Sequence, residues 1–204
     1  MRKKLSVLAA LAVIVAAVAV PSAAHAALST NLSQVINQGT LSVDFVDGSN
    51  ASIASPSVSF GAVDFSFACQ PATATLGTAS QKLQVKNPKK AGVKIDLNTP
   101  VPATDKWTSG GNNYKYNDAA GSGCTNGQLA VSGGTFTKTI GANVPTYTMP
   151  GGAFTGASSV TLFNNTSTTA YNGDITNYTL TQQIPAEQTD GTYSLPMVVS
   201  YVAQ

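Results

Sequence analysis

The sequence predicts an all-β protein that folds as a single β-sandwich of about nine or ten strands with long loops. After the first 26 residues, short runs in which apolar and polar residues alternate are separated by turn-forming residues at near-regular spacing. Charged residues are few, whereas the Thr, Ser, Asn and Gly typical of exposed strands and turns are abundant. No segment after residue 26 shows a convincing helical pattern, which leaves strands as the building elements.

The first 26 residues are predicted to be a secretory signal peptide. Basic residues occupy positions 2–4, residues 5–20 are almost wholly apolar, and residues 24–26 fit the small-x-small cleavage rule. The apolar run is short for a membrane span, which needs about 20 residues, and a retained N-terminal anchor is the alternative. We therefore expect a secreted, cell-surface-associated domain at residues 27–204, with no membrane span after signal cleavage.

Cleavage would leave a nearly neutral chain without Arg or His, since Arg2 and His25 leave with the signal. Eight Lys then face eight Asp and one Glu, for a net charge of about −1. This balance offers no basic patch, so we expect no nucleic-acid partner. The missing His excludes Ser–His and Cys–His pairs and His-ligated metals, and the single Glu, Glu187, falls in a predicted turn. We expect no enzymatic activity.

Two cysteines remain in the predicted exported domain, Cys69 and Cys124. An even number of cysteines outside the cytoplasm favours one disulfide, although two unrelated thiols are the alternative. The bridge would close a loop of about 55 residues and stabilise the fold by roughly 4 kcal/mol.

Residues 28–37 are consistent with two conformations. Their apolar positions fit one helical face, but LSQVI at 32–36 and GTLS at 39–42 repeat the pattern of LTQQI at 180–184 and GTYS at 191–194. The later copy lies in a predicted strand, so we favour an extended conformation for the first one.

The strand predictions follow the alternation along the chain. A strand is expected at residues 40–46, and another at 58–67 with a bulge at Gly61, where the alternation changes parity. Residues 80–87 and 93–97 alternate cleanly around a turn and predict a β-hairpin.

The second half is predicted to hold longer loops. Residues 99–127 should be loop-rich, with short ordered pieces around Trp107 and Tyr114. Two strands joined by PAEQTDG should close the chain as a second hairpin within residues 175–204. Between the loop-rich region and this hairpin, strands are expected at residues 128–131, 135–140 and 160–163.

Calcium is the only cofactor that the residues support, since it needs only oxygen ligands. Asn117 and Asp118 precede a Gly-rich loop, and Asp105 or Asp174 would complete the site from elsewhere. The spacing is not that of an EF-hand, and an Asx-type turn beside the disulfide explains the same residues.

Several aromatic residues fall in or near predicted loops. Trp107, Tyr114 and Tyr116 are the candidate ligand-binding residues, and Tyr147 and Tyr171 also lie in or near predicted loops. Exposed rings would form a platform for a glycan or cell-wall polymer, whereas rings packed beneath long loops would serve stability alone.

The order of elements resembles that of the WxL-type bacterial cell-surface β-domains. The resemblance is carried by SVSFG at 57–61, QKLQV at 81–85, GVKIDL at 92–97 and YTLT at 178–181. The Trp-x-Leu motifs are absent, and Val93 and Tyr178 stand where the tryptophans are expected. The resemblance implies an immunoglobulin-like, WxL-like sandwich with a non-catalytic role at the cell wall.

Two functions are consistent with the sequence. The first is a cell-surface binding or adhesion module whose partner is a wall polymer or another surface protein. The second is a structural subunit of an extracellular fibre or matrix, in which residues 28–45 add a strand to a neighbouring copy. Pairing of that segment within its own domain is the simpler alternative.

Overall fold

The computed structural model describes residues 33–118 and 125–204, which contain strands and no helix. The all-β prediction is therefore confirmed, and no helix in this part of the chain is long and apolar enough to cross a membrane. Four of the twelve strands have only two or three residues. The strands are β1 Ser42–Val46, β2 Gln70–Leu76, β3 Lys82–Asn87, β4 Val93–Asn98, β5 Trp107–Ser109, β6 Asn112–Tyr114, β7 Gln128–Ile140, β8 Tyr147–Thr148, β9 Gly152–Ala153, β10 Val160–Asn165, β11 Tyr171–Ile184 and β12 Val198–Ala203.

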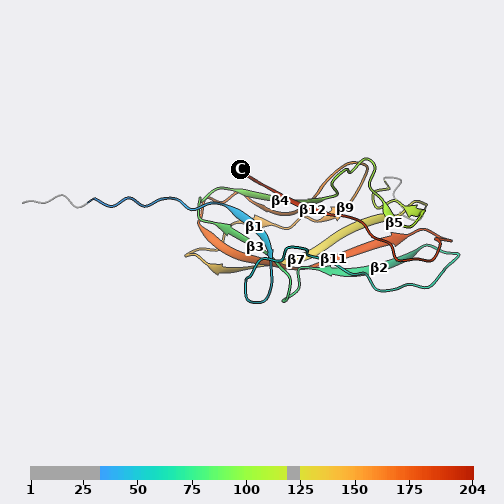
Figure 1. Ribbon diagram of the computed structural model, residues 1–204. Coiled ribbons are helices and arrows are strands. Elements are labelled where there is room, and N and C mark those ends of the chain that lie inside the picture. The colour runs from blue at the N-terminus through green and yellow to red at the C-terminus, as the bar shows by residue number, and fades with distance from the viewer. Residues whose placement is uncertain (1–32, 119–124) are drawn as a thin grey trace, which may run out of the picture. The chain divides into compact units, whose positions relative to one another are not determined.

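The larger sheet is organised around the long strand β11. β7 pairs with β11 along most of its length, and β9 pairs with β7. On its other side, β11 pairs with β3 through its first half and with β2 through its second half, so β2 and β3 follow each other along the same side of β11 (Figure 1). β1 pairs with β3 and extends that half of the sheet by one strand.

The change from β2 to β3 occurs at a glycine. Gly77 has a φ of 80°, and a Cβ on it would lie 2.8 Å from the Cα of Thr176. Its carbonyl accepts a hydrogen bond of 2.7 Å from the N–H of Asn177. Only glycine combines this conformation with so close a backbone approach, which fixes where the edge strand is interrupted.

The second sheet has the order β12-β4-β10-β8, and β5 and β6 form a separate two-stranded sheet. In β4, alternate residues face the core, as the period of two predicts. One hydrophobic cluster joins side chains from both larger sheets. It includes Leu83 and Val85 of β3, Val93, Ile95 and Leu97 of β4, Leu162 and Phe163 of β10, and Ile175, Tyr178 and Leu180 of β11.

Both predicted hairpins are wrong. β3 and β4 are consecutive but lie in different sheets, and the same holds for β11 and β12. In the connection from β3 to β4, the side chain of the fully buried Asn87 donates to the carbonyl of Ala91 at 2.8 Å. This bond stabilises the turn by which the chain passes from one sheet to the other. Alternation fixes which face of a strand is buried, but two strands on opposite sides of one core show the same alternation.

The predicted strand at 58–67 is also wrong. The segment is not part of any sheet, and Val63, Phe65 and Phe67 are exposed. The N–H of Glu187 donates to the carbonyl of Ser66 at 2.8 Å, so the contact there is with a connection and not with a strand. The alternation is present, but no neighbouring strand among the described residues supplies the ladder.

Residues 33–40 belong to no strand. Val35 and Ile36 are 83 % and 84 % exposed. The chain divides into two units at residues 36 and 37, and residues 33–36 of the first unit are extended and belong to no strand. The hypothesis that this segment pairs within its own domain finds no support in residues 33–40.

Candidate functional site

An apolar groove of about 450 Å³ opens between the two larger sheets. Its lining takes one residue from each of six strands of the two larger sheets, four of them buried Leu side chains that also belong to the core. The groove therefore reaches the interior of the fold. The six residues are Phe45, Leu76, Leu97, Leu129, Leu180 and Val199.

Two connections border the apolar groove. On one side, Ser57 is held by Gln81, whose side-chain amide accepts from the Ser57 N–H at 3.1 Å and donates to the Ser57 carbonyl at 2.9 Å. This pair of bonds imitates a β-bridge and places Val58 and Phe60 beside the groove. On the other side lie residues 193–197, which lead into β12. The border thus consists of connections outside the two larger sheets, and Ser194 is bridged to Thr108 of β5 by two backbone hydrogen bonds of 2.9 Å.

Strand β12 continues the groove as a free sheet edge. Within residues 33–118 and 125–204 it pairs with β4 alone, where Tyr201 lies opposite Ile95 and Ala203 opposite Val93. Both β4 residues are fully buried, yet Tyr201 is 45 % exposed and Ala203 is also exposed. Opposed residues share a face of the sheet, so the core-facing side of β12 is left uncovered at Tyr201 and Ala203, whereas Val199 on the same side packs against the core.

Four aromatic rings form a cluster beside the apolar groove. Phe60 meets Trp107 edge to face at 5.5 Å, Trp107 stacks on Tyr114 at 6.1 Å, and Tyr114 contacts Tyr193 at 5.1 Å. The indole N–H of Trp107 donates to Oε1 of Gln182 at 2.8 Å, which fixes the ring. A second hollow of about 410 Å³ lies against the same rings. Burial raises the pKa of the Tyr114 hydroxyl, which stays neutral.

Two of the three predicted ligand-binding aromatics thus come together, and the third does not join them. Tyr116 is fully buried, donates to or accepts from Thr99 Oγ1 at 2.9 Å, and packs edge to face on Phe154 at 5.4 Å. Tyr171 is buried against Phe136 at 5.6 Å. Tyr147 is half-buried and stacks on Phe163. These last three rings pack against the core.

Phe60, Tyr193 and Gln182 belong to this cluster and were not predicted. The alternation at residues 58 and 60 was a usable signal for Phe60, because it implied one buried face. Nothing in the sequence places Tyr193 beside Tyr114, since that contact depends on how the connection after β11 crosses between sheets.

The residues proposed for calcium are engaged in separate hydrogen bonds. Asn117 donates from its side chain to the carbonyls of Pro102 and Gly156, and Asp118 accepts from Asn126 at 3.2 Å. Asp105 accepts from the N–H of Val101 at 2.6 Å. The fourth residue, Asp174, lies in the larger sheet.

No group of three or more His, Cys, Asp or Glu suited to a metal occurs within residues 33–118 and 125–204. The Gly-rich loop at 119–124 lies outside the described residues, so calcium binding stays a prediction.

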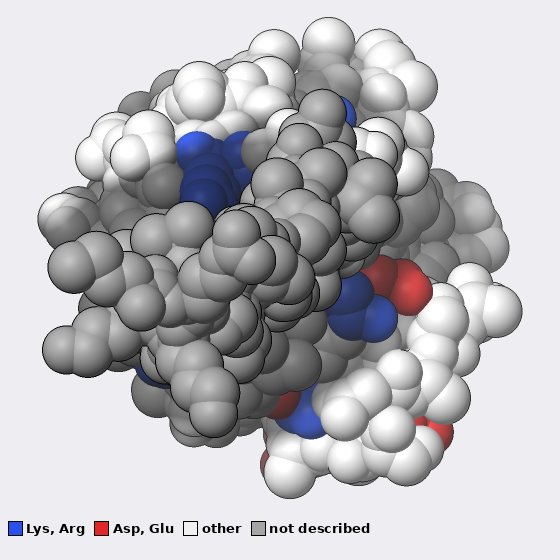
Figure 2. All heavy atoms as spheres, turned by 90° about the vertical axis from the view of Figure 1, so that its left-hand side faces the viewer, with Lys and Arg blue, Asp and Glu red and all other residues white. Residues whose placement is uncertain are grey.

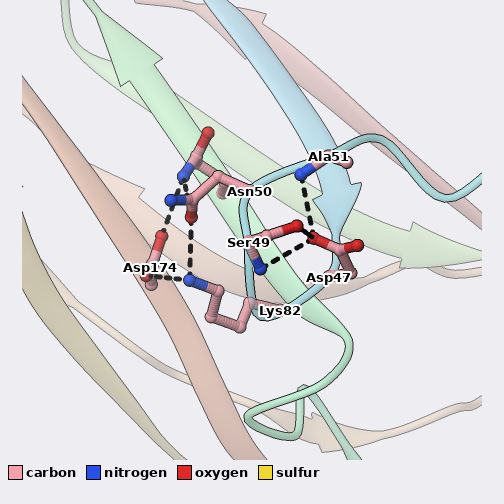
Figure 3. Close-up of polar contacts among 7 residues, drawn as sticks. Asp47, Ser49, Asn50, Ala51, Lys82 and Asp174 are labelled. Atoms are coloured by element: carbon pink, nitrogen blue, oxygen red, sulfur yellow. Dashed lines mark hydrogen bonds and ion pairs between the residues drawn. The ribbon is translucent and has the colours of Figure 1, made fainter.

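Asp174 belongs to a polar cluster that fastens the turn after β1 to the larger sheet (Figure 3). Lys82 Nζ lies 2.8 Å from Asp174 Oδ2 and 2.9 Å from Asn50 Oδ1, and Gln84 donates to the same two side chains. Asp47 accepts from the N–H groups of Ser49 and Ala51 at the turn. The lysine ammonium occupies the place between oxygens that a cation would take, so this cluster serves to hold the turn.

The Ser49 hydroxyl donates to Asp47 Oδ1 at 2.7 Å, and this bond is the first cause of a lowered pKa at the Asp47 carboxyl. The carboxylate therefore stays charged to lower pH than an ordinary aspartate, and the turn keeps its acceptor.

Of the predicted disulfide, only one end is described. Cys69 directly precedes β2, with its Sγ 3.5 Å from Oε1 of Gln183 on β11. Cys124 lies outside the described residues, as does the predicted signal peptide, and both remain predictions.

On the face shown in Figure 2, Lys and acidic side chains form small separate groups among uncharged residues. Comparison with protein-family models, curated proteins and solved structures gives no match. The resemblance to WxL-type domains therefore stays a prediction.

Proposed function

We propose that the protein is a non-enzymatic structural subunit of an extracellular fibre or matrix, whose copies assemble by strand addition through the N-terminal segment. The observation that carries this proposal is the state of residues 33–40, which are extended and paired with no strand, and which present Val35 and Ile36 to solvent. Apolar side chains exposed to this degree on an unpaired segment favour a partner that buries them.

The donated segment is shorter than residues 28–45. β1 begins at Ser42 and pairs with β3 of its own chain, and Leu41 is buried in its own core. Gln38 donates to the carbonyl of Lys89 at 2.8 Å, which ties the base of the segment to its own domain. The segment free to be donated is therefore residues 28–37.

Electron microscopy and analytical ultracentrifugation test the proposal on the chain of residues 27–204. We expect filaments or large oligomers from this chain, and their loss when residues 27–37 are deleted. The deletion leaves the core strands intact, so an unchanged melting temperature serves as its control. A monomeric full chain, or filaments that survive the deletion, would overturn the proposal.

A second candidate function, surface binding or adhesion, is favoured by the cluster of Trp107, Tyr114 and Tyr193 beside its hollow. Aromatic faces next to a cavity suit the apolar faces of sugar rings. Purified cell walls should retain the protein, and Trp107→Ala should reduce retention, whereas Tyr147→Ala should not, because Tyr147 packs on Phe136 and Phe163 and does not line this hollow. Equal retention of all three proteins would argue against this function.

A further inference from the structure

We infer that the free edge of β12, together with the apolar groove beside it, is the acceptor site for residues 28–37 of a second copy of this chain. This inference rests on the proposed function, because it names the site at which the proposed assembly takes place. It also gives the assembly a direction, from the N-terminal segment of one copy to the C-terminal strand of the next.

β12 is the least protected of the free strand edges in the described chain. Its sequence, VVSYVA, contains no charged residue and no proline, the two common protections of an exposed edge. β2 carries Pro71, and β8 and β9 have two residues each. β1 carries Asp44 and is partly covered by the turn that follows it, through a bridge between Val46 and Ser52.

The inner face of β12 lacks a cover that an added strand would supply. Tyr201 and Ala203 face the core side yet are exposed, and Val199 lines the apolar groove. A strand hydrogen-bonded to β12 would direct every second side chain toward this face. Because the groove is lined by apolar residues of both sheets, apolar side chains fit it best.

The N-terminal segment has the matching pattern. Positions 32, 34 and 36 carry Leu, Gln and Ile, as do positions 180, 182 and 184 of β11. In β11, Leu180 and Gln182 are both buried on the core side, so this sequence forms a strand with one inward face. Residues 32–36 are therefore suited to form a strand whose inward face carries Ile36.

Length and symmetry agree with this assignment. Ten extended residues reach about 33 Å, and the six residues of β12 need about 20 Å. Donor and acceptor are different surfaces of the chain, so each copy that donates still offers its own acceptor. Such head-to-tail contacts produce open filaments unless the rotation closes a ring.

Photo-cross-linking of the 27–204 chain tests the acceptor. A benzoylphenylalanine is placed at position 36 in one preparation and at position 35 in another, and each is mixed with an isotope-labelled copy before assembly. We expect position 36 to cross-link to residues 195–203 of the other copy, and position 35, on the opposite face, to give at least about fivefold less of this product.

Charge variants give an independent measure. Ile36→Asp and Tyr201→Lys each place a charge that the added strand would bury, and should reduce sedimenting polymer at least tenfold. Val35→Asp and Val202→Lys are the matched controls, since both residues are exposed, Val202 lies on the other face of β12, and Val35 would lie on the other face of the added strand. They should change polymer less than threefold.

The outcomes separate this inference from the proposed function. Filaments whose cross-links map to β1 or β2 would overturn the acceptor assignment and leave the strand-addition function standing. Cross-links within a single copy would show that the segment occupies its own groove and would overturn the inference. A chain that neither assembles nor cross-links would overturn both.

Discussion

Tyr201 of β12 lies directly opposite Ile95 of β4, yet the first is 45 % exposed and the second is fully buried. Neighbouring residues on one face of a sheet normally share their environment, because the opposite layer covers both. The boundary of the covered core therefore runs between these two strands.

This boundary predicts that replacing these two side chains by Ala reduces the free energy of unfolding by different amounts. Ile95→Ala removes fully buried methyl groups and should reduce the free energy of unfolding by about 2–5 kcal/mol. Tyr201→Ala removes a half-exposed ring and should cost less than about 1.5 kcal/mol. Urea denaturation of both variants at low protein concentration measures the difference, and equal losses would show that the inner face of β12 is covered.

A glycine under an aromatic ring gives a second prediction. A Cβ on Gly173 would overlap the ring of Phe136, which cannot withdraw because three other rings pack around it. Gly173→Ala should therefore destabilise the fold by about 1–3 kcal/mol. Gly61→Ala is the control, since nothing lies within 4 Å of its added Cβ, and it should be neutral within about 0.5 kcal/mol. Thermal melts of the two variants check the contrast. The three rings are Tyr147, Phe163 and Tyr171.

The two ion pairs of the described chain should differ in strength. In the pair Lys82–Asp174 the side chains are 15 % and 12 % exposed, whereas Lys94 in the pair with Asp96 is 35 % exposed. Lys82→Met leaves a largely buried carboxylate without its cation and should cost about 1–3 kcal/mol. Lys94→Met should cost less than about 1 kcal/mol. Chemical denaturation measures both, and a Lys82→Met loss as small as that of Lys94→Met would contradict the structural role of this cluster.

Stability should fall in alkali. Burial is the first cause of a raised pKa in four tyrosines, so the folded chain holds these phenolic protons more tightly than the unfolded chain does. Their contribution is fully present below the unfolded pKa of about 10 and is lost as the pH rises through the folded values. The residues are Tyr114, Tyr116, Tyr171 and Tyr178.

Unfolding free energies at about pH 8 and pH 11 measure this loss, and absorbance near 295 nm reports whether phenolate appears together with unfolding. Ionisation of all tyrosines while the fold persists would contradict the burial of these rings.

The alternation of residues predicted burial well and partners poorly. Val93, Ile95 and Leu97 were expected on one face, and all three are buried. Their pairing with β10 and β12 depends on contacts remote in sequence, which local patterns do not encode. β2 was missed altogether, because its alternating positions carry Ala and Thr in place of large apolar residues.

In the candidate site, too, the sequence indicates individual residues but not the contacts between residues remote in the chain. Trp107 and Tyr114 were identified by their residue type and do lie together, since β5 and β6 pair directly. The groove itself could not be predicted, because its lining residues come from seven strands between residues 45 and 199 that meet only in the complete fold.

The pairing of β12 with β4 also governs when folding can finish. Val198 pairs with Asn98, about 100 residues earlier in the chain, and loops of that length close slowly. While the chain is being synthesised, β4 therefore offers an unpaired edge until residues 198–203 emerge. A shortened chain that ends before residue 198 keeps the N-terminal segment but lacks β12. Such a chain would keep the proposed donor segment and lose the proposed acceptor strand.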